Sequence, residues 1–105
     1  MKTVITSQGN SKESLFDTRF GRAAWFCIYN ENSRDTEFKE NIYAQAQGGA
    51  GRQAAEMMAS LGVTKVISGD FGPKAKELLD KLNIQMVVIP NEDTTVQNII
   101  NKLSK

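Results

Sequence analysis

Apolar residues recur at helical spacing in three segments of the second half of the chain. In the first, positions 54, 57, 58 and 61 are apolar, and Gly62 follows as a C-terminal stop. The same spacing returns in 75–82, after Pro73, and in 96–103. We therefore predict three helices, the first of which begins near Arg52. Thr94, with Gln97 three residues later, predicts a capping box before the third helix.

Short apolar or β-branched runs predict five strands, at 3–6, 24–29, 36–42, 63–68 and 84–89. The first three are too closely connected for helical crossovers, so they should be antiparallel. The last two flank a predicted helix and should form a right-handed parallel crossover, parallel to the first strand. The predicted fold class is α/β, with element order β-β-β-α-β-α-β-α and a mixed five-stranded sheet carrying helices on its faces. We expect residues 1–105 to form a single domain.

Charge and composition narrow the function classes. Thirteen Lys and Arg residues oppose twelve Asp and Glu residues, which leaves a formal charge of +1. This near-neutrality argues against a nucleic-acid partner and against a membrane surface. No segment approaches the run of about 18 apolar residues that a membrane span needs. The N-terminus lacks the apolar stretch of a signal peptide, so we expect a cytoplasmic protein.

The reactive side chains argue against catalysis. The chain has no histidine, and Cys27 is its one cysteine, so no Ser-His or Cys-His pair exists. The first predicted strand carries no carboxylate for a nuclease-type metal site, and Asp17 with Asp70 is weak support for one. We expect a protein that is not an enzyme. Cys27 lies within an apolar strand, where we expect it to pack as a small buried hydrophobe.

Two glycine-rich turns stand directly before predicted helices, at 47–51 and 69–73. Glycine admits close backbone approach, and the free N–H groups of a helix start attract anions. Because open α/β sheets bind ligands at the carboxyl ends of their strands, we expect both turns to meet there. A third loop, with two arginines, should join them. The predicted ligand-binding residues are Arg19, Arg22, Gly48, Gly49, Gly51, Gly69 and Gly72.

The arginine loop has two interpretations. Arg19 and Arg22 can clamp an anion through charge-assisted hydrogen bonds. Alternatively, Asp17 pairs with one arginine while Phe20 fills the edge of the sheet. Neither glycine turn matches a nucleotide-binding motif, so no nucleotide is implied.

Three ordered motifs resemble the dinitrogenase iron-molybdenum cofactor biosynthesis family, and the resemblance runs from Met1 to Leu103. The motifs are Arg19-Phe20-Gly21-Arg22-Ala23, then Gly48-Gly49-Ala50-Gly51 with Gln53-Ala54-Ala55, and Val66-Ile67-Ser68-Gly69 with Gly72-Pro73-Lys74-Ala75. The resemblance implies a ribonuclease H-like three-layer sandwich. It also implies a small carrier that binds an iron-sulfur or iron-molybdenum-type cluster, or its precursor. Such a carrier would have a cofactor-assembly or acceptor protein as its partner.

The chain departs from that family at the metal ligands. In cofactor-carrying members of that family, histidine or cysteine side chains are expected as metal ligands. This chain has no histidine, and Cys27 is its one cysteine. A single thiolate holds a cluster loosely, so an anion-binding cradle would have to supply the rest. The sequence leaves open whether Cys27 is a ligand. The alternative function is a protein–protein interaction or regulatory domain without a cofactor.

Overall fold

The predicted strands and helices are all present in the computed structural model, which describes residues 1–90 and 93–103. The elements are β1 (Lys2–Ser7), β2 (Trp25–Asn30), β3 (Thr36–Glu40), α1 (Ala50–Ser60), β4 (Val63–Ser68), α2 (Pro73–Lys81), β5 (Gln85–Val88) and α3 (Val96–Leu103). Their order is the predicted one. The first helix begins at Ala50, two residues before its predicted start, because the glycine turn itself forms the N-cap.

The five strands form one mixed sheet in the order β3-β2-β1-β4-β5. β1 pairs antiparallel with β2, which pairs antiparallel with β3. On its other side β1 pairs parallel with β4, and β4 pairs parallel with β5. The prediction of an α/β fold with these strand directions is confirmed. Central β1 turns Val4 and Ile5 to opposite faces, as the two-residue period of a strand requires.

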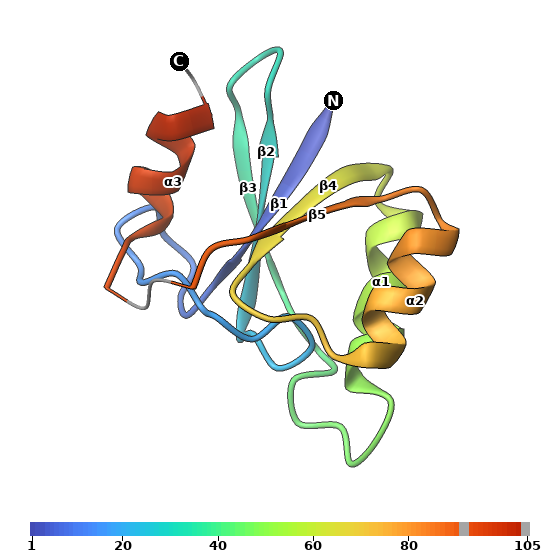
Figure 1. The fold of residues 1–105 in the computed structure, drawn as a ribbon. Coiled ribbons are helices and arrows are strands. Elements are labelled where there is room, and N and C mark those ends of the chain that lie inside the picture. Colours follow the sequence, from blue (N-terminus) through green and yellow to red (C-terminus); the bar gives the residue numbers. More distant parts are fainter. Residues whose placement is uncertain (91–92, 104–105) are drawn as a thin grey trace.

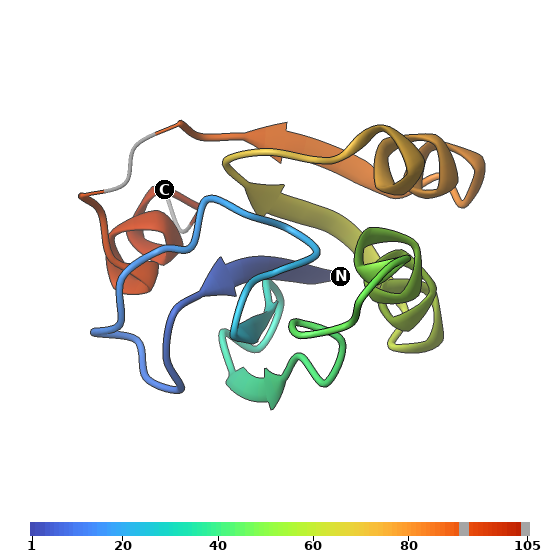
Figure 2. The same cartoon turned by 90° about the horizontal axis from the view of Figure 1, so that it is seen from below.

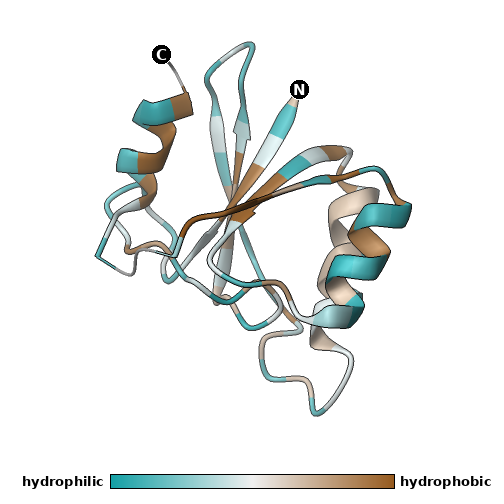
Figure 3. Ribbon diagram, viewed as in Figure 1, coloured by the Kyte–Doolittle hydropathy of each residue, from teal (hydrophilic) through white to brown (hydrophobic). Residues whose placement is uncertain are grey.

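Helices cover both faces of the sheet (Figures 1 and 2). α1 and α2 lie on one face, where Met58 and Leu79 pack against Val4 and Val66. α3 lies on the other, where Val96 and Ile99 pack against Ile5 and Ile67. Figure 3 shows the apolar side of α3 turned toward the sheet. The molecule is therefore a sandwich of helix, sheet and helix layers.

The predicted cap of the third helix is wrong by one residue. The side-chain oxygen of Thr95 accepts the backbone N–H of Asn98 at 3.2 Å. The backbone carbonyl of Thr94 instead accepts the N–H of Phe16 at 2.9 Å. The side chain of Gln97 donates to Asn101 and does not reach back to the helix start. The long loop after β1 thus makes a backbone hydrogen bond to Thr94, the residue before the N-cap of α3.

Different segments of the chain gather at the two ends of the sheet. The loops that follow β1 and β4, and the first turns of α1 and α2, gather at one end (Figure 1). The amino end of β1 and the carboxyl end of α3 lie toward the other end. Within the described residues, no helix is long and apolar enough to cross a membrane.

Candidate functional site

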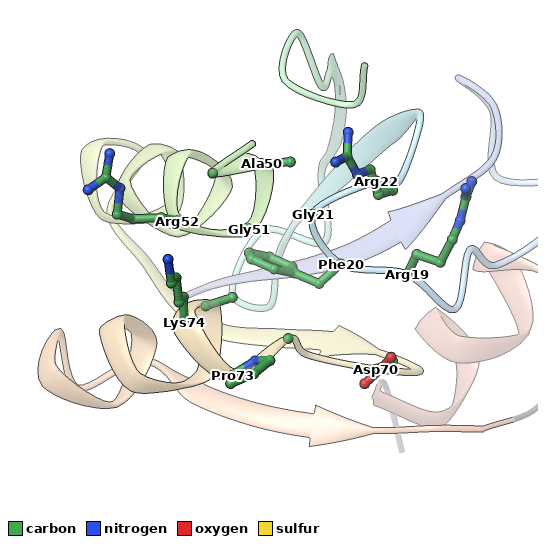
Figure 4. Close-up of a pocket in the computed structure, with 13 residues that line it drawn as sticks. Arg19, Phe20, Gly21, Arg22, Ala50, Gly51, Arg52, Asp70, Pro73 and Lys74 are labelled. Atoms are coloured by element: carbon green, nitrogen blue, oxygen red, sulfur yellow. The ribbon is translucent and has the colours of Figure 1, made fainter. Parts of the chain in front are cut away.

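A pocket of about 500 Å³ opens where three chain segments converge at the carboxyl ends of the parallel strands. Its walls come from residues 19–22 of the long loop after β1, from 49–52 at the start of α1, and from 70 and 72–75 at the start of α2 (Figure 4). The site therefore joins parts of the chain that lie up to slightly more than half its length apart.

Most of the residues predicted from the sequence meet in this pocket. Its lining includes Arg19, Arg22, Gly49, Gly51 and Gly72. Gly48 and Gly69, which were predicted with them, are not part of this lining. That any of these residues binds a ligand stays a prediction. Gly48 precedes the wall formed by the start of α1, and Gly69 is covered by the neighbouring loop.

Close packing within the chain explains two of these glycines. A Cβ atom on Gly69 would lie 2.5 Å from Cβ of Thr18, which is too close for any side chain. A Cβ atom on Gly51 would lie 3.1 Å from Cβ of Ala75. The smallness of Gly69 and Gly51 thus serves contact between loops and helices rather than the approach of a ligand.

Both helices present uncapped first turns to the pocket. The N-cap of α1 is Gly49, with a left-handed φ of 72°, and that of α2 is Gly72. Neither N-cap makes a side-chain capping hydrogen bond, and the described first turns contain no acidic residue. The first N–H groups of an α-helix have no partner within the helix, and they carry a partial positive charge. Two such helix starts form a wall suited to an anion.

Cationic side chains outnumber acidic ones around the pocket. Arg19, Arg22, Arg52 and Lys74 line it together with one carboxylate, that of Asp70. Figure 4 shows Arg52 and Lys74 on the same side, where α1 and α2 begin, and Asp70 on the other side. Sequence reasoning missed Arg52 and Lys74. The available signal was a basic residue in the first turn after each glycine-rich segment.

Arg19 is paired within its own loop. Its Nε donates to Oδ1 of Asp17 at 3.1 Å, and its Nη2 lies 3.1 Å from Oδ2. The hydrogen bond to Asp17, and then its charge, raise the pKa of Arg19 further above its ordinary value. The Asp17 side chain is 3% exposed and that of Arg19 is 63% exposed. Arg19 therefore presents a permanent charge from a fixed position.

Phe20 fills the edge of the sheet, as the second interpretation of this loop predicted. It is buried, and its ring centroid lies 6.0 Å from that of Phe26 and 5.3 Å from that of Phe71. The aromatic ring forms the apolar floor on which the charged rim stands. The second interpretation is confirmed, because Asp17 also pairs with Arg19. Both arginines are part of the pocket lining, and the anion clamp stays a prediction.

Arg22 and Asn41 bind the segment that leads into α1. Nη1 of Arg22 donates to the backbone carbonyls of Ala44, at 3.0 Å, and of Ala46. The side-chain amide of buried Asn41 donates to the carbonyl of Ala23 at 2.8 Å. Sequence reasoning missed Asn41, whose only signal was an amide at the end of a strand of charged residues.

Cys27 lies away from the pocket, and the prediction that it is buried is confirmed. It packs in the cluster beneath α3, on the face of the sheet opposite to Met58 and Leu79 of α1 and α2. Burial raises the pKa of the Cys27 thiol from 9.0 to about 12. Across residues 1–90 and 93–103, no group of three or more His, Cys, Asp or Glu side chains is placed to hold a metal ion.

The comparison with protein families fits this arrangement. A sequence model of the family described as dinitrogenase iron-molybdenum cofactor matches residues 1–105. The chain belongs to this family. The match confirms the resemblance to this family that the three motifs indicated. A search of curated proteins found no match.

Solved structures support the same relationship for this member of the dinitrogenase cofactor family. The apo form of the orange protein from Desulfovibrio gigas shares 29% identity at a TM-score of 0.89, covering 96% of this chain and 84% of that one. A Thermotoga protein assigned as NifB shares 32% identity at a TM-score of 0.83, covering 98% and 86%. A Methanocaldococcus jannaschii protein assigned as a dinitrogenase, at 13% identity and a TM-score of 0.62, covers 99% and 85% and shows similarity of fold alone. The chain is thus a small cofactor-related protein.

Proposed function

We propose that the protein is a non-catalytic carrier that binds an anionic metal–sulfur cofactor, of iron-sulfur or iron-molybdenum type, or a precursor of one. The bound cluster is cargo, which the carrier passes to a cofactor-assembly or acceptor protein. A ribonuclease H-like classification and a cytoplasmic location belong to the same proposal.

The single observation that carries this proposal is the convergence on one pocket of two uncapped helix starts and the cationic side chains of Arg19, Arg52 and Lys74. A metal–sulfur cluster with net negative charge exposes sulfide atoms that accept hydrogen bonds. Backbone N–H groups and guanidinium groups are donors for such atoms. The positive charge and the hydrogen-bond donors of the pocket therefore fit an anionic cluster that is bound through its sulfides, without a protein ligand on its metal atoms.

The scarcity of metal ligands agrees with this mode of binding. The described residues offer no cluster of His, Cys, Asp or Glu, and the thiol of Cys27 is buried on the far face of the sheet. We therefore expect the cluster to keep its own sulfides, with Arg52 and Lys74 holding one side of it and Arg19 another. The amides near Gly49, Gly51 and Gly72 would complete the cradle.

Equilibrium binding of tetrathiomolybdate, a dianion of molybdenum and sulfide, tests the proposal. We expect Arg52→Ala and Lys74→Ala each to weaken binding by about ten- to hundredfold, the contribution of one charge-assisted hydrogen bond. Lys102→Ala is the matched control, because it removes the same charge from the last turn of α3 on the opposite face. It should bind like the wild-type protein. Anaerobic loading with iron and sulfide, followed by metal and sulfide analysis, extends the test to iron-sulfur cargo.

Two results would contradict the proposal. One is a wild-type protein that binds no metal–sulfur anion under anaerobic conditions. The other is binding that the Arg52→Ala and Lys74→Ala substitutions do not weaken. A partner protein that binds equally well with and without loaded cargo would favour the interaction or regulatory domain instead.

A further inference from the structure

Three successive residues of the loop after β1, Gly21, Arg22 and Ala23, contact either the 41–49 segment that leads into α1 or the start of α1 itself. A Cβ atom on Gly21 would lie 2.8 Å from both Cα and N of Gly51, so the two backbones touch in the first turn of α1. Arg22 binds the carbonyls of Ala44 and Ala46. Consecutive residues of one loop thus contact both the tip of the 41–49 segment and the helix start that follows it.

Asn41 fixes the other end of the 41–49 segment. Its side-chain amide donates to the carbonyl of Gly21 at 3.0 Å and to that of Ala23 at 2.8 Å. Its side-chain oxygen accepts the N–H of Tyr43 at 3.1 Å. This buried side chain therefore has its hydrogen bonds satisfied by the two loops that it joins.

The guanidinium of Arg22 is engaged by this segment rather than turned to the middle of the pocket. Figure 4 shows its side chain pointing away from Pro73 and Lys74 of α2. Among the described residues, both hydrogen bonds of its side chain run to the backbone of the 41–49 segment. Arg22 is part of the pocket lining, and its charged end donates to the carbonyls of Ala44 and Ala46.

The segment needs such anchors, because glycine gives it unusual conformational freedom. Gly48 and Gly49 precede α1, and Gly49 adopts a φ of 72°. An anion site made of backbone N–H groups works only when those groups are held in place before the ligand arrives. Loss of the anchors would let the first turn of α1 fray and would scatter its donors.

We propose that Arg22 and Asn41 are positioning residues: they lock the 41–49 segment so that the start of α1 faces the pocket, and Arg22 acts through this contact rather than as a direct ligand of the anion. This role rests on the proposed function, since it concerns the same pocket. It separates Arg22 from Arg52 and Lys74, whose charges act on the anion itself.

Hydrogen exchange in the unloaded protein tests the positioning role without any ligand. The backbone amides of Ala44 and Ala46 donate to carbonyls within the segment, so their exchange reports on its order. Arg22→Ala and Asn41→Ala should each raise the exchange rates of these two amides by about tenfold, the scale of one lost hydrogen bond to a charged or buried group. Arg52→Ala is the matched control, since it removes a pocket arginine. It should leave these rates unchanged.

Binding of tetrathiomolybdate across a range of ionic strength provides the second measurement. We expect Arg22→Ala and Asn41→Ala to weaken binding by similar factors, about three- to tenfold, although Asn41 carries no charge. Asn41→Ala should keep the wild-type salt dependence. Arg22→Ala should reduce it less than Arg52→Ala does, because the side chain of Arg22 points away from Pro73 and Lys74. Arg52→Ala should weaken binding and also reduce the salt dependence, because it removes a charge that faces the anion.

The two proposals fail in different measurements. Unchanged exchange of the Ala44 and Ala46 amides in Arg22→Ala would overturn the positioning role. So would a loss of salt dependence in that variant as large as the loss in Arg52→Ala. Wild-type affinity in an Asn41→Ala protein whose loop exchanges faster would overturn it as well. Should Asn41→Ala fail to fold, the exchange and salt measurements on surface-exposed Arg22→Ala still decide the matter. A wild-type protein that binds no tetrathiomolybdate would overturn the proposed function, and the positioning role would fall with it.

Discussion

Cys27 packs beneath α3 with no exposed surface, and its thiol is far harder to ionise than a free one. The thiol is protonated in both the folded and the unfolded state below its unfolded pKa of 9.0, and between that value and a folded pKa of about 12 only the unfolded state ionises. Stability from this group is thus complete below pH 9.0 and is lost as the pH rises toward 12.

We therefore predict that alkali destabilises the wild-type protein more than Cys27→Ala. Between pH 9.0 and 12, the unfolding free energy of the wild-type protein should fall relative to that of Cys27→Ala by about 1.4 kcal/mol per pH unit. Urea unfolding of both proteins at neutral and alkaline pH measures this difference, and the remaining titrating groups cancel. The variant should bind tetrathiomolybdate like the wild-type protein. Lost binding in a folded Cys27→Ala protein would show that the thiol is a ligand.

Gly21 and Gly48 provide a second contrast at the scale of single residues. A methyl group on Gly21 would collide with the backbone of Gly51, whereas one on Gly48 meets nothing within 4 Å. We expect Gly21→Ala to lower the free energy of unfolding by about 1–3 kcal/mol and to weaken anion binding, because the two pocket walls must separate. Gly48→Ala should change neither. Equal stability of the two variants in urea would contradict this explanation.

At the start of α2, a residue that stabilises the helix competes with an anion for the same backbone N–H groups. Gly72 has the extended φ and ψ, −61° and 159°, of an ordinary N-cap, and open space surrounds its missing side chain. A capping residue there should stabilise α2 by about 0.5–1 kcal/mol. The native glycine leaves the amides of α2 free for a ligand.

Substitution of Gly72 separates the two effects. We expect both Gly72→Ser and Gly72→Asp to raise the urea midpoint. Only Gly72→Asp should weaken tetrathiomolybdate binding strongly, because it places a carboxylate among the cations of the pocket. Tight binding by the Asp variant would argue that the anion does not reach the start of α2.

The elements themselves could be predicted from the sequence, because each depends on local periodicity. The stripe from Ala54 to Leu61 and the apolar run 63–68 both appear in the structure near their predicted bounds. The contacts between loops could not be predicted, since they join residues far apart along the chain. The hydrogen bonds from Arg22 to Ala44 and the closeness of Gly69 to Thr18 are of this kind. Glycine signalled close approach, but the sequence did not say what would approach.

At the scale of the whole molecule, two apolar clusters share one sheet. Val4 faces the cluster beneath α1 and α2, and its neighbour Ile5 faces the cluster beneath α3. Since β1 supports both clusters, we expect the protein to unfold as one cooperative unit. The short connection 31–35 made the antiparallel pairing of β2 with β3 predictable, and the helix between β4 and β5 made their parallel pairing predictable. The antiparallel pairing of β1 with β2 was also predicted, but residues 8–24 between them are numerous enough for a crossover, so their length did not require it.

We predict that Ile99→Ala lowers the free energy of unfolding by about 2–5 kcal/mol, because it empties volume beneath α3. Fluorescence of Trp25, the one tryptophan of the chain, and circular dichroism should report the same urea midpoint. Separate midpoints would mean that the α3 layer unfolds on its own.

The pocket is lined by the loop after β1 and by the starts of α1 and α2. These segments gather at one end of the sheet, and the amino end of β1 and the carboxyl end of α3 lie toward the other (Figure 1). A surface tether or a fluorescent fusion joined to either of these ends would therefore be attached far from the end of the sheet that carries the pocket. The fold is in this respect suited to a sensor chip that displays the site to a flowing solution of metal–sulfur anions.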